Sequence, residues 1–175
     1  MTFPDSFTTA RLRAERLTAD HLGEVHRMHR DPAVMMHLGG VRDDDQTAAY
    51  LARNLAHWAT YGFGLWILRE VDGGDPIGRA VLRHLLIDGS DEVEVGYGFY
   101  PSHWGRGLAT EVTVALLALG RRHLHLTSIV AVTSPANRAS QHVLRKAGLV
   151  YERDFVHDGL PSSLFRTRDS DQERG

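Results

Sequence analysis

The spacing of hydrophobic residues changes along the chain between the period of a helix and that of a strand. Segment 6–13 is predicted to form a first strand, and Thr18 is placed to be the N-cap of a short helix that Pro32 interrupts. Residues 36–45 are typical of a flexible loop, and their acidic end precedes a second helix. Apolar side chains recur along this second helix at three- and four-residue spacing: Ala48, Leu51, Leu55 and Trp58.

From Phe63 onward the pattern becomes that of β-strands. Three strands are predicted over residues 62–71, 76–87 and 91–101, and the third of them ends at a proline. A helix should follow the glycine-containing stretch after that proline. Its apolar stripe consists of Leu108, Val112, Ala115 and Leu119.

The last third of the chain predicts another strand, a helix and a closing pair of strands. Residues 124–133 are rich in β-branched side chains and favour a strand. Pro135 and Gly148 bracket a helix, and two strands follow around the turn 157–161. The order β-α-α-β-β-β-α-β-α-β-β predicts an α/β (α+β) fold, in which helices cover both faces of a mixed sheet.

The composition restricts the class of protein. With 175 residues, 42% hydrophobic and 24% charged, the chain is expected to fold as one domain, residues 1–175, whose end at 169–175 frays. The net charge of −2 gives no attraction to nucleic acid, and no apolar run approaches the roughly 20 residues of a membrane span. The N-terminal stretch lacks the basic and apolar segments of a secretory signal, so we expect a cytoplasmic protein.

Cysteine is absent, which excludes disulfides, thiolate metal sites and cysteine nucleophiles. Eleven histidines are present, but the chain has no HExxH motif, and the histidines of HLH at 123–125 are predicted to lie on a strand. We therefore expect no metal site.

The clearest chemical signal is HWGRGLATE at 103–111, where glycines flank Arg106 directly before a predicted helix. A helix N-terminus offers unpaired amide hydrogens and partial positive charge, and bare glycines let several amides converge on one anion. The stretch thus suits a phosphate or pyrophosphate. The alternative is a strand-to-helix turn in which the glycines only permit the backbone path. Neither GxxxxGK[ST] nor a GxGxxG after the first strand is present.

The strand before this loop adds a second signal. Strict alternation places Val93, Val95, Tyr97 and Phe99 on one face of segment 91–101. The other face carries Glu92, Glu94, Gly96 and Gly98. Along the chain, this strand therefore offers first a carboxylate and then a segment without side chains, and the anion-binding loop comes after it. A bulge explains the glycines equally well, but an extended ligand with a pyrophosphate at one end, such as an acyl-coenzyme A, fits the whole line.

Together, EVGYGFYPSHWGRGLATE and TSPANRASQHVLRKAGLVYE resemble the GNAT superfamily of acyl-CoA-dependent N-acetyltransferases. Within it, the chain is similar to the branch that includes the ribosomal-protein N-terminal acetyltransferases, whose opening segment is echoed by ARLRAERLTADH. The resemblance covers about residues 10 to 168. It implies a mostly antiparallel sheet that is splayed at the cofactor slot.

The resemblance also assigns residues to acetyl-CoA. The cofactor-binding set consists of Tyr97, Gly98, Phe99, Trp104, Gly105, Arg106, Gly107, Leu108, Ala109, Thr110 and Asn137. Trp104 stands where the family usually has Gln or Arg, so phosphate binding should rest more on backbone amides and Arg106. Backbone groups of 97–99 would pair with the pantetheine arm, and one amide there would hold the thioester oxygen. Arg145 and Lys146 either approach the adenosine phosphate or form a solvated helix face.

Two residues carry the implied catalysis. Glu94 matches the family's strand glutamate and would act as a base through water; the alternative is a solvated carboxylate or a partner for a nearby arginine. The tyrosine that protonates the leaving sulfur in many relatives is replaced by Leu144. Ser140 matches the serine proposed for that role in this branch, unless its hydroxyl only bonds the helix backbone. The thiolate would otherwise leave without enzymatic protonation.

The resulting hypothesis is acetyl transfer from acetyl-CoA to a primary amine by direct attack in a ternary complex. The acceptor is a protein N-terminus or a small amine, held between loop 36–45 and the last two strands; Asp43, Asp44 and Asp45 either attract a cationic acceptor or cap a helix. Two alternatives stay open: a non-catalytic CoA-binding sensor or partner-binding module, and a nucleotide-binding enzyme of another fold. The oligomeric state is also open, a homodimer being common among similar proteins.

Overall fold

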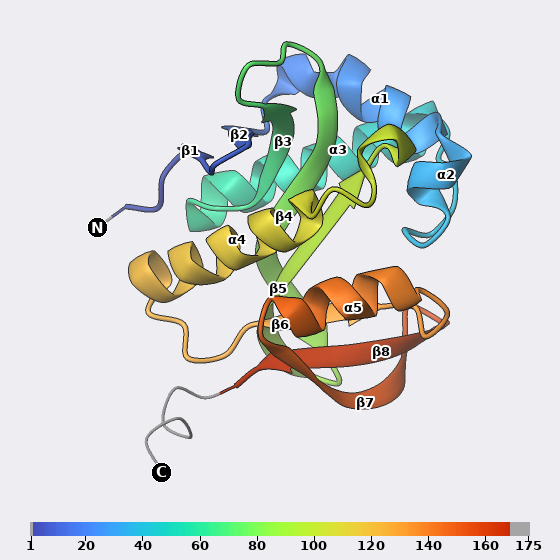
Figure 1. Ribbon diagram of the computed structural model, residues 1–175. Helices are drawn as coiled ribbons and strands as arrows, with labels where there is room; N and C mark the ends of the chain where they lie inside the picture. Colours follow the sequence, from blue (N-terminus) through green and yellow to red (C-terminus); the bar gives the residue numbers. More distant parts are fainter. Residues whose placement is uncertain (1, 169–175) are drawn as a thin grey trace.

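A computed structural model describes residues 2–168, and its strands form one eight-stranded sheet in the order β1-β2-β3-β4-β5-β6-β8-β7 (Figure 1). The strands are β1 (Ser6–Thr8), β2 (Leu12–Arg16), β3 (Leu65–Glu70), β4 (Pro76–Ile87), β5 (Ser90–Phe99), β6 (Val130–Thr133), β7 (Leu149–His157) and β8 (Leu160–Thr167). Neighbours are antiparallel except β5 and β6, which are parallel and share a single register pair, Glu94 with Val130. The predicted mixed, mostly antiparallel sheet is confirmed, and it is splayed between β5 and β6.

Helices cover both faces of the sheet, as predicted. They are α1 (Leu22–Arg30), α2 (Pro32–Met35), α3 (Asp44–Tyr61), α4 (Leu108–Leu124) and α5 (Arg138–Lys146), with short 3-10 turns η1 (Ala19–His21) and η2 (Pro101–His103). In Figure 1, α4 crosses in front of the central strands and α3 lies behind them, while α5 covers the β6–β8 end. No helix among the described residues is long and apolar enough to cross a membrane. The predicted frayed tail at 169–175 lies outside the described residues.

The helix starts follow local capping chemistry. Thr18 has an extended backbone and its amide donates to His21 Nδ1 at 2.9 Å, which confirms it as the N-cap of the turn that leads into α1. Asp31 interrupts the helix before Pro32, because a residue that precedes proline disfavours the helical conformation. Asp43 caps α3, with its Oδ1 2.8 Å from the Gln46 amide, while Gln46 Oε1 accepts from the Asp43 amide at 3.0 Å.

Three predicted boundaries were wrong. Segment 6–13 is not one strand but the whole of β1, a turn and the start of β2. Loop 36–45 is shorter than predicted, because α3 already begins at Asp44. In segment 124–133 only β6 is extended: α4 continues through Leu124, and His125, with φ of 54°, ends it as its amide bonds to Gly120 O. A short apolar run does not distinguish the end of a buried helix from a strand.

The core lies on the strand face that alternation predicts. Val93, Val95 and Phe99 are buried against α4, which fixes the opposite direction for the intervening residues of β5. Trp58 and Trp66 meet edge to face in the core, with ring centroids 5.1 Å apart, whereas Trp104 is half exposed. Glu94 and the two glycines of β5 therefore face the side covered by α1–α3.

Candidate active site

The loop between β5 and α4 presents a run of unpaired backbone amides. Gly105 and Gly107 have φ of 72° and 76°, a left-handed conformation that glycine adopts without steric cost. Within residues 2–168, the amides from Gly105 to Thr110 donate to no backbone carbonyl; the first paired amide is that of Glu111, 3.1 Å from Gly107 O. Converging free amides at a helix N-terminus form a site for an anion.

A carboxylate from α4 holds this loop in place. Glu111 accepts hydrogen bonds from Thr9 Oγ1 at 2.6 Å, from the Arg11 amide at 2.8 Å and from Arg11 Nε at 2.7 Å. Arg11 Nη1 also donates to Arg106 O at 2.7 Å. Partial burial raises the pKa of Glu111, but the hydrogen bonds from Thr9 and Arg11 outweigh this effect and hold the pKa below its usual value. The partners are about 100 positions apart in sequence, so no local pattern could have revealed the clamp.

Two side chains of the loop that were predicted to bind the cofactor, those of Arg106 and Trp104, are bonded to other parts of the protein. The Arg106 guanidinium is not beside the amides but 2.6 Å from Glu70 Oε1, in a pair whose side chains are 43% and 39% exposed. Exposed pairs of this kind are weak, so an arriving phosphate can compete for the guanidinium. The Trp104 indole donates to Phe99 O at 2.8 Å and thereby fixes the end of β5.

Glu94 is buried and paired with Arg83. Its Oε2 accepts from Arg83 Nε at 2.9 Å, across the β4–β5 ladder in which the two residues are direct partners. The negative charge of Glu94 raises the pKa of Arg83. The sequence leaves three interpretations of Glu94 open: a base, a solvated carboxylate or the partner of a nearby arginine. The structure shows the ion pair with an arginine. Within the described chain, Oε1 has no protein hydrogen-bond partner and can accept one from water.

Ser140 and Tyr97 meet on the opposite face of β5. The Tyr97 hydroxyl lies 2.9 Å from Ser140 Oγ, and burial raises the pKa of Tyr97 to about 12. Asn137 caps α5 by accepting from the Ser140 amide at 3.0 Å, which leaves the Nδ2 group of its side chain free to donate. Leu144, the position at which the family resemblance places a tyrosine in many relatives, is buried in the core.

The tyrosine hydroxyl is the functional group that sequence reasoning missed. Tyr97 entered the predicted site only through its backbone, because alternation places its ring on the core face. Only the packing of α5 near β5 shows that this ring carries a hydroxyl to Ser140. Among the predicted residues, Tyr97, Asn137 and Ser140 come together, whereas Glu94 lies on the other face of the same strand.

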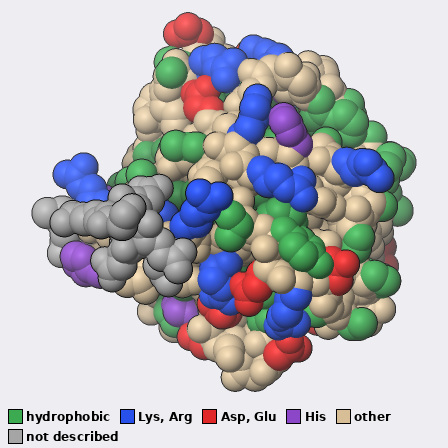
Figure 2. Space-filling model, turned by 60° about the horizontal axis from the view of Figure 1, so that its bottom comes forward, with side chains coloured by type: hydrophobic (Ala, Val, Ile, Leu, Met, Phe, Trp, Pro, Cys, Tyr) green, Lys and Arg blue, Asp and Glu red, His purple; other side chains and the backbone are tan. Residues whose placement is uncertain are grey.

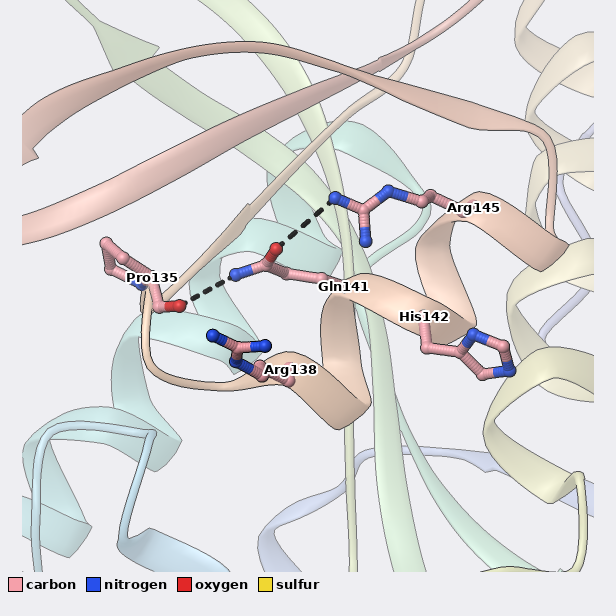
Figure 3. A pocket seen from close by; sticks show the side chains of 5 residues that line it. All are labelled: Pro135, Arg138, Gln141, His142 and Arg145. Carbon is pink, nitrogen blue, oxygen red and sulfur yellow. Dashed lines mark hydrogen bonds between the residues drawn. The ribbon is translucent and has the colours of Figure 1, made fainter.

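A hollow of about 400 Å³ lies along α5 and is lined by Pro135, Arg138, Gln141, His142 and Arg145 (Figure 3). Gln141 Nε2 donates to Pro135 O at 2.9 Å, and Arg145 Nη2 donates to Gln141 Oε1 at 3.4 Å. The lining contains two guanidiniums and no carboxylate, so it suits an anionic group. Figure 2 shows Lys and Arg side chains in several separate places on this end of the molecule rather than in one continuous patch.

The described part of the chain shows no cluster of side chains that could bind a metal ion. No group of three or more His, Asp or Glu side chains is arranged there to hold a metal ion. The features that remain are a row of amides, a splayed strand edge, a buried carboxylate on one side of that edge and a hydroxyl pair on the other.

Comparison with known proteins gives a consistent picture. The family described as acetyltransferase (GNAT) domain matches residues 11–150. An uncharacterized protein of Bacillus subtilis, YkkB, is 31% identical over 138 residues, which cover 79% of this chain and 80% of that protein. The crystal structure of an acetyltransferase from Agrobacterium tumefaciens superposes with a TM-score of 0.83 at 26% identity, covering 97% and 96% of the two chains.

A more distant structure shares the fold alone. The ribosomal L7/L12 alpha-N-protein acetyltransferase in complex with coenzyme A has a TM-score of 0.74 at 16% identity, covering 97% of this chain and 98% of that one.

Proposed function

The chain belongs to the GNAT family of acetyl-CoA-dependent N-acetyltransferases, and from that membership we propose that it moves an acetyl group to a primary amine by direct attack in a ternary complex. The observation that carries the proposal is the row of free amides from Gly105 to Thr110, which follows the unpaired edge of β5 after the short turn η2. One extended thioester could bind the amides with its diphosphate and the strand edge with its pantetheine arm.

Residues of the loop and of α5 would bind the coenzyme. The diphosphate seats on the amides of 105–110, and Arg106 exchanges Glu70 for a phosphate oxygen. The pantetheine arm runs along 97–99, where the splayed sheet leaves β5 without a neighbour and Asn137 Nδ2 is free to donate. The basic hollow beside Arg138 and Arg145 would receive the adenosine phosphate.

The two faces of β5 divide the proton transfers between them. On one face, Glu94 Oε1 accepts the amine proton through water, so that the nitrogen lone pair can attack the thioester carbonyl. A backbone amide of 97–99 stabilises the oxyanion that forms, and its collapse breaks the carbon–sulfur bond. On the other face, the hydroxyl pair of Tyr97 and Ser140 donates a proton to the departing thiolate. Since the pKa of Tyr97 is raised to about 12, this pair is protonated at neutral pH.

The Arg83–Glu94 pair favours one alternative, a CoA-binding sensor that uses the carboxylate only to hold β4 against β5. A sensor would bind the coenzyme but would not need a free carboxylate oxygen.

An amine panel separates the two functions. Thiol release from acetyl-CoA is measured for the wild type and Glu94→Gln, with CoA-induced thermal shift as the check on folding. Glu92→Gln is the matched control, because Glu92 is also an ion-paired carboxylate of β5, bonded to Arg166 at 2.9 Å. We expect Glu94→Gln to lose about a hundredfold in kcat/KM and the control to keep its activity. Equal turnover in all three proteins refutes Glu94 as the base; CoA binding without any turnover favours the sensor.

A further inference from the structure

The face of β4 and β5 that carries Glu94 also carries arginines directly beside the bare segment. In the antiparallel register, Arg79 is opposite Gly98 and Arg83 is opposite Glu94. A methyl group added to Gly98 would lie 3.9 Å from Arg79 Nε and 3.0 Å from Leu38 Cδ1. Arg79 and the loop after α2 therefore close over the strand segment along which the thioester is proposed to lie.

A second arginine approaches the same point from that loop. The guanidinium carbons of Arg42 and Arg79 each lie 4.8 Å from the centroid of the Tyr50 ring, and Arg79 Nη1 donates to the Tyr50 hydroxyl. Both guanidiniums also reach one ring nitrogen, His29 Nε2, at 3.0 Å from Arg42 Nη1 and 3.4 Å from Arg79 Nη1. The cluster is thus built from α1, the α2–α3 loop, α3 and β4.

His29 is neutral and does not balance this charge. It is fully buried, and burial together with the charges of the two arginines lowers the pKa of His29 to about 3. A guanidinium has only donors, so Nε2 must be the acceptor and Nδ1 must carry the proton, which it donates to Thr47 Oγ1 at 2.9 Å. The histidine therefore orients Arg42 and Arg79 without supplying a negative charge.

Positive charge exceeds negative charge in the cluster. Three arginines, Arg42, Arg79 and Arg83, lie here against two carboxylates: Glu94, whose hydrogen bond goes to Arg83, and Asp158, whose charge also raises the pKa of Arg83. Within residues 2–168, neither Arg42 nor Arg79 forms an ion pair with a carboxylate, although Arg79 is only 9% exposed. Placing a buried cation without a counter-ion is costly, and an anionic ligand would offset that cost.

We propose that Arg42 and Arg79 form a recognition subsite for an acidic group of the acceptor, a carboxylate or a phosphate, so that this enzyme acetylates amines that also carry a negative charge. The inference rests on the proposed function, because it places the acceptor amine at Glu94 and its acidic group at the arginine pair. The planar forks of two guanidiniums match the oxygens of either group.

Two of the acidic residues near the cluster, Asp43 and Asp44, are already engaged elsewhere. Asp43 is engaged as the cap of α3, and Asp44 pairs with Arg30 and lies 3.2 Å from His26 Nδ1. The capping alternative is thus confirmed for Asp43, while Asp44 has a different partner, the Arg30 guanidinium.

The test compares acceptors that differ mainly in charge. Initial rates with acetyl-CoA are measured for 4-aminobutanoate, butylamine and 1,4-diaminobutane, and for 2-aminoethyl phosphate against ethanolamine. The same amines are titrated by calorimetry into the protein saturated with CoA, which reports acceptor binding without turnover. Arg42→Gln removes the guanidinium of the partly buried arginine of the cluster, and Arg42→Lys keeps the positive charge but not the planar fork. Arg121→Gln, at the exposed end of α4, is the matched loss of charge.

We expect the anionic amines to exceed their neutral partners about tenfold or more in kcat/KM or in affinity, and Arg42→Gln to reduce that ratio about tenfold. In Arg42→Lys this ratio should lie between those of the wild type and Arg42→Gln, and Arg121→Gln should keep the wild-type ratio. The carboxylate and phosphate arms identify which anion is preferred. Turnover of neutral or cationic amines without an anionic preference overturns the subsite but leaves the acetyltransferase standing. Selective binding of anionic amines without turnover supports the subsite and overturns the proposed function.

Discussion

The Tyr97 hydroxyl lies 2.9 Å from Ser140 Oγ and joins the C-terminal part of β5 to the first turn of α5 across the gap where the sheet is splayed. Glu94, three residues earlier on the same strand, points to the other face and bonds to Arg83. The carboxylate proposed as the base and the hydroxyl pair proposed as the acid thus lie on opposite faces of β5. In the proposed mechanism, this arrangement would let one strand serve both proton transfers.

Removing the tyrosine hydroxyl should slow the chemical step. We expect Tyr97→Phe to lower kcat about tenfold or more, because Ser140 loses the hydroxyl that can pass it a proton. The measurement is steady-state thiol release with saturating acetyl-CoA, beside Tyr151→Phe, which changes an exposed tyrosine on β7. An unchanged kcat in Tyr97→Phe would show that the thiolate leaves without this pair.

The glycine loop should be sensitive to a single methyl group. In Gly105→Ala the side chain has open space, but φ of 72° costs a non-glycine residue about 1 kcal/mol and favours a different path of the amides. We expect the KM for acetyl-CoA to rise several-fold. Gly74→Ala, also in open space but without a positive φ, is the control. Equal KM values in the two variants would contradict the role of the loop backbone.

The clamp at Glu111 should support both stability and coenzyme binding. Glu111→Gln weakens the charged bonds from Thr9 and Arg11, and since Arg11 is 47% exposed we expect a loss of only about 1 kcal/mol in the free energy of unfolding. The KM for acetyl-CoA should rise, because Arg11 no longer holds Arg106 O firmly. Urea unfolding and steady-state kinetics measure the two effects, and a change in neither would show the clamp to be dispensable.

The same clamp predicts a dependence on pH. The pKa of Glu111 is lowered below its ordinary value of 4.5 in the folded protein, so the unfolded state takes up the proton first as the pH falls. The contribution of ionised Glu111 to the free energy of unfolding is therefore complete above about pH 4.5. It is lost as the pH falls through the lowered pKa of the folded state. The difference in unfolding free energy between wild type and Glu111→Gln should narrow in that window. A constant difference from pH 7 to pH 3 would contradict this assignment.

Sequence alone determined the features that depend on near neighbours. The caps at Thr18 and Asp43 and the break at Pro32 follow from hydrogen bonds and steric limits that act within three or four residues. The two faces of β5 follow from alternation, and the family motifs indicated the acetyltransferase. The end of α4 was missed because a short apolar run suits either a helix or a strand.

Only the tertiary structure decided which distant groups meet. Glu111 holds Arg11 from 100 positions away, Tyr97 meets Ser140 over 43 positions, and Arg79 reaches Tyr50 over 29. Such contacts depend on strand order and on how each helix lies over the sheet, and no local period encodes either one. For the same reason the arginine cluster proposed as the acceptor subsite became visible only in the packing of α1, α3 and β4 around His29, whereas the acidic run at 43–45 had left a cationic acceptor and a helix cap as open alternatives.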